Sequence, residues 1–219
     1  MDKKIETRAY SFEIRADEGY NITGRPIVYN SKTDLGYFDE IIERGALDKA
    51  DLRDVRFLVN HDTKSIPLAR SRRNNANSTM QMTTDDEGMM IRVTLDVENN
   101  TEARNLYSAI KRGDITGMSF CFSVDDERWE NLDTDHPTRH ILSISNVSEV
   151  SAVTFPAYEA TTIQARSKEA LDNARAALDK AEARDEEALD SAINAQKEEE
   201  KRELELLKAK IRIYGGITK

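Results

Sequence analysis

A long stretch without helix-breaking residues constrains the fold of this chain more than any other feature of its sequence. Between Pro156 and Gly215 there is neither proline nor glycine, whereas the first 156 residues contain all four prolines and seven of the nine glycines. Proline and glycine are the residues that most disfavour a helix interior. The sequence therefore predicts a domain over residues 1–165 and, within residues 166–219, one long charged helix.

The predicted helix carries a broken, heptad-like stripe of apolar residues. Its members are Leu171, Ala174, Leu178, Ala181, Leu189, Ile193, Leu204, Leu207 and Ile211. Because alanine is frequent near its start, the stripe is too weak to stabilise the helix without a partner. Two interpretations stay open, namely a solvated spacer with paired Glu and Lys side chains and a coiled-coil or scaffold-like contact.

The preceding domain is rich in short segments of alternating polarity, which are typical of β-strands. They cover residues 9–16, 25–30, 55–60, 78–84, 88–97, 117–124, 139–147 and 149–155. So many short strands indicate a barrel or a sandwich. Thr101 is expected to cap an internal helix that Gly113 ends, and a second helix is expected at "RGALDKAD", residues 44–51. The predicted class is α+β with strands dominating.

Composition excludes several classes of function. The formal net charge of -9 disfavours nonspecific DNA binding, because the chain lacks the excess of Lys and Arg that a phosphate backbone attracts. Cys121 is the only cysteine, so neither an intrachain disulfide nor a CxxC metal site can form. No apolar stretch is long enough for a signal peptide or a membrane span. We therefore expect a soluble cytoplasmic protein that makes no membrane contact.

The three histidines are the natural candidates for a general base near neutral pH. His136 lies in a polar loop and His140 opens the next strand, so both are expected to face solvent. His61 instead ends the apolar segment "VRFLVN", where a rigid strand can present a side chain. A histidine at a strand end is more often structural, so His61 needs partners before it indicates catalysis.

A nucleophile has to come from Ser, Thr or Cys, because no HExxH or similar spacing of metal ligands is present. In "GMSFCFSV", alternation places Ser119 and Cys121 on one face of a strand and Phe120 and Phe122 on the other, core-facing side. Ser119 needs an adjacent base such as His61. Cys121 is the rival nucleophile, and an ordinary strand residue is the simplest interpretation of either.

Glu149 is the candidate for a third group that orients the histidine. It is the only acid in the segment "EVSAVTF", and an acid in an apolar strand is costly to bury without a partner. An outward-facing glutamate is equally compatible with the alternation. Asp62 competes for the role, but adjacent strand residues point to opposite faces, which argues against Asp62 pairing with its neighbour His61.

Several segments together, in colinear order over about residues 7–166, resemble the prohead maturation proteases of tailed bacteriophages. The segments are "ITGRPIVYNSKTDLGYFDEIIERGALDKA", "VRFLVNHDTKSIPLARS", "GDITGMSFCFSV" and "ISNVSEVSAVTFPAYEATTIQAR". Proteins of this family are serine peptidases akin to herpesvirus assemblin. The resemblance implies an antiparallel β-barrel of the herpesvirus-protease type with flanking helices, and the long helix lies outside it.

The resemblance also implies roles for individual residues. His61 is expected to be the general base, Ser119 the nucleophile and Glu149 the third member of the triad. Two positions depart from the family pattern, since Cys121 and Ala69 stand where glycine is usual. The first places a bulkier side chain near the nucleophile, and the second alters a turn near Arg70, which is a candidate for binding the oxyanion.

In biological terms, the resemblance predicts an enzyme without a metal or cofactor that works inside the procapsid, in the cytoplasm of the host bacterium. Its expected substrates are the scaffolding segment of the major capsid protein and the protease itself, which would act as a homo-oligomer without binding a specific nucleic acid. The alternative is a capsid assembly or scaffolding protein that acts through the long helix. Both roles could belong to one chain.

Overall fold

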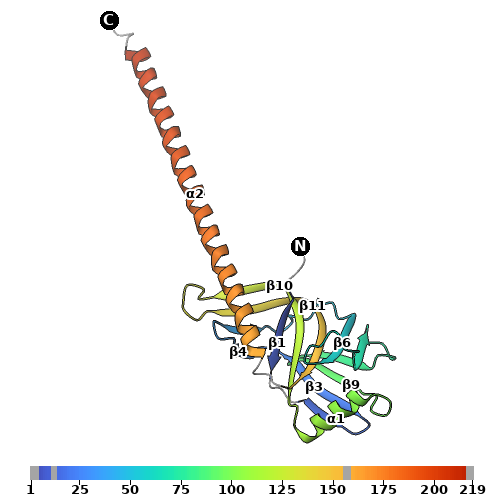
Figure 1. Cartoon of the computed structure of the whole chain (residues 1–219). Coiled ribbons are helices and arrows are strands. Elements are labelled where there is room, and N and C mark those ends of the chain that lie inside the picture. Colours follow the sequence, from blue (N-terminus) through green and yellow to red (C-terminus); the bar gives the residue numbers. More distant parts are fainter. Residues whose placement is uncertain (1–4, 11–13, 155–158, 216–219) are drawn as a thin grey trace. The chain divides into compact units, whose positions relative to one another are not determined.

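The computed structural model describes residues 5–10, 14–154 and 159–215 (Figure 1). The chain divides into two compact units, Met1–Leu171 and Asp172–Lys219. The first unit contains all the strands and one short helix, and the second consists of most of the long C-terminal helix. Strands combined with a long C-terminal helix confirm the predicted α+β class.

The described strands form two sheets. The larger contains β1 (Glu6–Tyr10), β10 (Gly117–Glu130), β11 (Thr138–Val153), β5 (Asp39–Ile42) and β4 (Lys32–Asp34) in that order, with β6 (Asp54–Val59) and β7 (Ala69–Arg72) joined to it through β11. The smaller contains β2 (Ile14–Asp17), β3 (Asn21–Val28), β9 (Gly88–Thr94) and β8 (Met80–Asp85). Most pairs are antiparallel, but β11 runs parallel to both β5 and β6.

The core lies between the two sheets because the strands alternate apolar and polar side chains. Met118, Phe120 and Phe122 of β10 are fully buried, as the period of two predicts for a core face. The helix α1 (Thr101–Arg112) packs beside β2, and its Tyr107 hydroxyl donates a hydrogen bond to the Asp17 carbonyl at 2.8 Å.

An ion-pair network, made of Glu6, Arg8, Glu40, Glu127 and Arg139, ties β1, β5, β10 and β11 together. Its two arginines and Glu40 are buried, whereas Glu127 lies at its exposed edge. Arg8 binds Glu40 and Glu6, and Arg139 contacts Glu6 at 2.7 Å and Glu40 at 3.1 Å. Arg139 also pairs with Glu127. Both guanidinium groups are 3% exposed, so each buried charge depends on its partners.

The structure differs from the predicted barrel because no backbone ladder among the described strands joins the two sheets. At the edge of β7, hydrogen bonds to side-chain hydroxyls, rather than a backbone ladder, connect this strand to the segment before β8. The hydroxyls of Ser78 and Thr79 accept hydrogen bonds from the backbone amides of Arg72 and Arg70. The sheets are therefore open, whereas a barrel needs continuous strand pairing around the ring.

Several local predictions also differ from the structure. Residues 44–49 form turns rather than a helix. Asn100, rather than Thr101, caps α1, because its side chain accepts hydrogen bonds from two backbone amides of the first turn. Gly113 ends the helix in the left-handed conformation, as predicted. The strands β4, β5 and β7 are too short to show a clear alternation and were not predicted.

The long helix α2 (Glu159–Gly215) confirms the prediction from the missing prolines and glycines. Leu171, the last residue of the first unit, is buried against Leu35 and Phe38. Beyond it, the apolar side chains other than the partly buried Ala174 are exposed up to residue 209, the last whose side chain is described. Among the described residues, no helix combines the length and apolar character that a bilayer span requires.

Candidate active site

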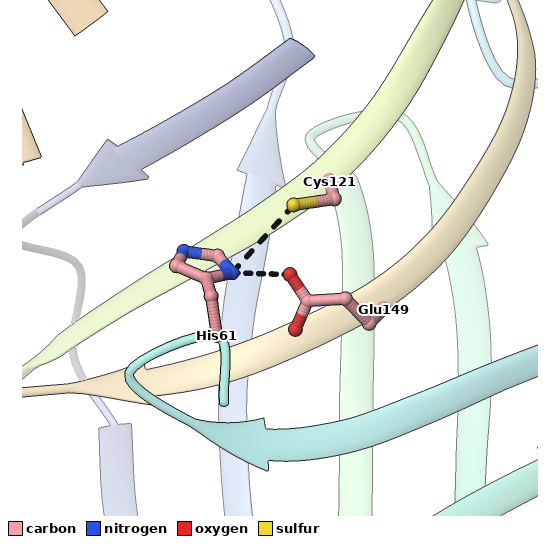
Figure 2. Close-up of side chains that lie close together, drawn as sticks. All are labelled: His61, Cys121 and Glu149. Atoms are coloured by element: carbon pink, nitrogen blue, oxygen red, sulfur yellow. Dashed lines mark hydrogen bonds and ion pairs between the residues drawn. The ribbon is translucent and has the colours of Figure 1, made fainter. Parts of the chain in front are cut away.

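Segments of three neighbouring strands bring His61, Ser119 and Glu149 together. Figure 2 shows His61 and Glu149 with the neighbouring Cys121. Ser119 lies on β10 and Glu149 on β11, and the antiparallel register of these strands places Cys121 opposite Glu149 and Ser119 opposite Ser151. On its other side, β11 pairs in parallel with β6, and His61 follows the end of β6. The site therefore depends on pairings between segments that lie far apart in the sequence.

The side chains form a continuous chain of hydrogen bonds. His61 Nε2 lies 2.6 Å from Ser119 Oγ, and His61 Nδ1 is hydrogen-bonded to Glu149 Oε1. Ser119 is 0% exposed and Glu149 is 5% exposed, while the His61 side chain keeps 18% of its surface. An acid, an imidazole and a hydroxyl in this order form the arrangement that activates a serine for acyl transfer.

An unusual turn directs His61 toward the sheet. Asn60 and His61 both have positive φ angles, 50° and 55°, which bend the chain sharply after β6. Asn and His tolerate this left-handed region better than most residues do. The Asn60 side chain holds the turn by donating to Thr154 Oγ1 at 3.1 Å and accepting from the Thr154 amide at 2.9 Å. The turn therefore positions the imidazole over β11.

Ser151 is a member of the site that the sequence analysis missed. Its hydroxyl donates to Glu149 Oε2 at 2.7 Å and accepts a hydrogen bond from the His61 backbone amide at 3.1 Å. Ser151 is fully buried and holds both partners of the ion pair in place. The spacing of two in "EVS" puts Glu149 and Ser151 on the same strand face, which was the available signal.

The backbone of β1 lies against Ser119. In the antiparallel register of β1 and β10, Ala9 is opposite Ser119 and Thr7 is opposite Cys121. Ser119 Oγ donates a hydrogen bond to the carbonyl oxygen of Arg8 at 2.8 Å. Since β11 pairs with the other edge of β10, the strand that carries Ser119 is covered along both edges.

Comparison with known proteins decides the family. A model of the caudovirus prohead serine proteases matches residues 4–175. The chain belongs to this family. The membership confirms the resemblance seen in the sequence and identifies the chain as one of a family of serine peptidases of phage proheads.

One solved structure is also similar, the capsid assembly protease gp21 of bacteriophage T4. Its sequence is 11% identical, the TM-score is 0.39, and the alignment covers 70% of this chain and 98% of that chain. No curated protein matches the chain.

Cys121 and Asp62 were the alternative nucleophile and the alternative acid in the sequence analysis. Cys121 lies beside the imidazole, with Sγ 3.6 Å from His61 Nδ1, but Ser119 rather than Cys121 is bonded to Nε2. Asp62 is exposed and accepts hydrogen bonds from the Lys64 amide and the Ser65 hydroxyl, which lower its pKa, with the Ser65 bond contributing most. The structure therefore does not make Asp62 the partner of His61.

Arg70 lies on β7, and its guanidinium binds Asp54 through two hydrogen bonds of 2.6 and 2.8 Å, so its role at the oxyanion stays a prediction. Ala69 belongs to a regular strand pair with Phe57, not to a turn. His136 is exposed, as predicted. The prediction for His140 was wrong, because its side chain is 9% exposed and bonded to Glu43 at 2.7 Å.

Proposed function

We propose that this chain is the capsid maturation endopeptidase, which cleaves the scaffolding segment of the major capsid protein and processes itself inside the procapsid. The hydrogen-bonded series Ser119, His61 and Glu149 carries the proposal, since it supplies a nucleophile, a base and an orienting acid in bonding contact. Family membership supports the serine peptidase class.

In the proposed mechanism, His61 Nε2 accepts the hydroxyl proton as Ser119 Oγ attacks the scissile carbonyl carbon. Glu149 accepts the Nδ1–H hydrogen bond, so it fixes the tautomer and stabilises the imidazolium that forms. The imidazolium then protonates the leaving amine, and an acyl-enzyme remains on Ser119. Water, activated by His61, hydrolyses this ester and regenerates the hydroxyl. Backbone amides or Arg70 are the expected donors to the oxyanion.

The decisive experiment compares the wild-type protein with Ser119→Ala on the cognate capsid protein, with fragments mapped by mass spectrometry. We expect discrete cleavage by the wild type and a loss of about 10⁶-fold in turnover for the variant, the usual effect of removing a triad nucleophile. Cys121→Ser serves as the matched control, because it alters the neighbouring thiol on the same strand face. Undiminished cleavage by Ser119→Ala, or a comparable loss in Cys121→Ser, would contradict the assignment.

A second function, in capsid assembly, is favoured by the surface of α2. Its exposed apolar side chains include Leu178, Leu189, Ile193, Leu204, Leu206 and Leu207. Burying such side chains against a second helix is favourable, whereas a purely solvated helix gains nothing from them. We propose that α2 forms a coiled-coil or scaffold-like contact. Removal of residues 172–219 should then leave peptidase activity intact but prevent procapsid assembly, and normal assembly would exclude this role.

A further inference from the structure

Cys121 adds a third potential metal ligand to two members of the proposed triad. Its Sγ, a His61 ring nitrogen and a Glu149 carboxylate oxygen all lie within 4.8 Å of one another. In Figure 2 the thiol and the carboxylate approach the same edge of the imidazole, and each forms a hydrogen bond with Nδ1. We propose that these three side chains bind Zn²⁺ or a similar thiophilic divalent cation, and that this cation inhibits the enzyme.

The donor set and its geometry suit zinc. Zinc prefers thiolate, imidazole and carboxylate ligands in a tetrahedron, with bonds of about 2.0–2.3 Å that place ligand atoms roughly 3.3–3.7 Å apart. The 3.6 Å between Cys121 Sγ and His61 Nδ1 already meets this requirement. The carboxylate oxygen, now hydrogen-bonded to Nδ1, has to retreat by about 1 Å, which rotation of the Glu149 side chain allows. Water would complete the fourth position.

A hydrated cation can reach the site from solvent. The His61 side chain is 18% exposed and Cys121 is partly exposed, while Glu149 lies behind them. Ser151 holds the second oxygen of Glu149 at 2.7 Å, in the way that outer partners orient metal-bound carboxylates. The sequence shows no ligand spacing because the three ligands come from the turn after β6, from β10 and from β11.

Metal binding would block the proposed mechanism without touching Ser119. The thiol loses its proton to solvent when it becomes a ligand, and Nδ1 has to present its lone pair to the metal. The neutral imidazole then carries its proton on Nε2, so Nε2 donates to Ser119 Oγ and can no longer accept the hydroxyl proton. A triad fixed in the wrong tautomer loses about 10⁴-fold in turnover, as replacement of the triad acid shows elsewhere.

Binding is tested first in the full-length Ser119→Ala protein, so that the result does not depend on peptidase activity. Co²⁺ serves as the spectroscopic probe, because a cysteine thiolate bound to it gives an intense near-ultraviolet charge-transfer band, and Zn²⁺ should displace it. The matched control is Ser119→Ala with Cys121→Ala, which should lack the band and bind Zn²⁺ at least about tenfold more weakly. Absence of the band in the first protein, or equal Zn²⁺ affinity in both, would overturn the proposed site.

Inhibition, which rests on the proposed function, is tested separately. Each protein is compared with its own rate in EDTA. Zn²⁺ should reduce cleavage by wild-type protein reversibly and should affect Cys121→Ala at least about tenfold less. Equal inhibition of the two would overturn the inhibitory role, whereas absence of cleavage in EDTA would count against the proposed function and leave the binding result standing.

The strand β1, which lies beside Ser119 at the edge of β10, supports a second, independent inference. A serine hydroxyl has one proton, and here it is donated to the Arg8 carbonyl, although catalysis requires His61 Nε2 to accept it. Ser119 is 0% exposed, with β1 and β11 on the two edges of its strand. We infer that β1 has to leave the edge of β10 before a substrate can react, and that an extended peptide then pairs with β10 in its place.

The side chains of β1 show what resists this displacement. Arg8 belongs to the ion-pair network through Glu40 and Glu6, and Thr7 Oγ1 lies 3.2 Å from Cys121 Sγ. An incoming peptide gains the backbone hydrogen bonds that β1 gives up, so the exchange costs chiefly the contacts of Arg8. The position of β1 would therefore couple peptidase activity to the integrity of this network.

The neighbouring position of Thr7 and Cys121 allows a direct test. The substitution Thr7→Cys would create a cross-strand pair with Cys121 at a separation that a disulfide can bridge, locking β1 to β10. We expect oxidised Thr7→Cys to lose at least about 100-fold in cleavage rate and to recover on reduction, since a locked strand excludes substrate. Thr7→Ser under the same oxidising treatment cannot form the cross-link, so it serves as the control and should remain active.

Full activity of the oxidised protein, or equal inactivity of the oxidised Thr7→Ser control, would overturn the inference. A second readout does not depend on cleavage. In Ser119→Ala, backbone amides of β1 should lose protection from hydrogen exchange when a capsid-derived substrate peptide binds, because their partner strand is taken over. Unchanged protection of β1 in the peptide-bound protein would show that substrate binds with β1 in place.

Discussion

Two clusters that involve the long strands β10 and β11 pair buried carboxylates with bases, and they differ in the base that faces the acid. Near the start of β10, Glu149 is paired with His61. In the ion-pair network, Glu40 and Glu6 are paired with Arg8 and Arg139. Arginine stays protonated under all conditions that a protein meets, whereas histidine exchanges its proton near neutral pH. The first cluster can therefore move a proton, and the second can only hold charge.

Among changes that compare the two clusters, the largest expected effect comes from removing the acid of the first. Glu149→Gln keeps the size of the side chain but cannot stabilise an imidazolium or hold the correct tautomer. We expect cleavage of the capsid protein to fall by about 10⁴-fold, with kcat rather than KM carrying the change. The midpoint of urea unfolding should move little. Retention of more than about a tenth of the wild-type rate would show that Glu149 is not the orienting acid.

The matched change in the second cluster should affect stability instead. Glu40 is fully buried between Arg8 and Arg139, so Glu40→Gln leaves two buried cations undercompensated. We expect a loss of about 3–5 kcal/mol in the free energy of unfolding, measured by urea denaturation. Protein that remains folded should keep at least its wild-type turnover, because the proposed triad is untouched, and a higher turnover would support displacement of β1. An unchanged unfolding midpoint would contradict the structural role.

The ion-pair network should also lose stability in acid. Burial alone would raise the pKa of Glu6, but the hydrogen bond from Arg139 and the charges of Arg8 and Arg139 outweigh it and lower the pKa from 4.5 to about 2. Because the folded-state pKa is depressed, this contribution to stability is complete above about pH 4.5 and is lost as the pH falls toward 2. The total amounts to roughly 3 kcal/mol.

Unfolding free energies of the wild type and Glu6→Gln, measured between about pH 6 and pH 3, test this expectation. The variant should be less stable at pH 6 and should show a shallower decline with acid, because it lacks the titrating group. Parallel curves for the two proteins would mean that Glu6 titrates normally in the folded state.

The smallest effect is expected from removing most of α2. Side chains described from Asp172 onward are exposed except for Ala174 and Arg175, which are partly buried, so little apolar surface of the first unit should be uncovered. A chain that ends at Leu171 keeps the contact with Leu35 and Phe38. Its melting temperature should stay within about 2 °C of the full-length value. A larger drop would show that the strand domain depends on the helix for its stability.

Local patterns in the sequence determined a good part of this protein. Missing prolines and glycines predicted α2, and an alternation of period two placed Ser119 and Cys121 opposite the buried Phe120 and Phe122. These features could be predicted because helix and strand periodicities are properties of neighbouring residues. The family was also recognisable from short motifs in their order.

Only the tertiary structure decided how these elements meet. The parallel pairing of β6 with β11, the left-handed turn at Asn60 and His61, and the support from Ser151 bring the proposed triad into contact. The pairing of β1 beside Ser119 and the ion-pair network have no local signal in the sequence either. Strand order, parallel pairing and open or closed sheets depend on contacts between distant segments, whose energies a local pattern does not contain.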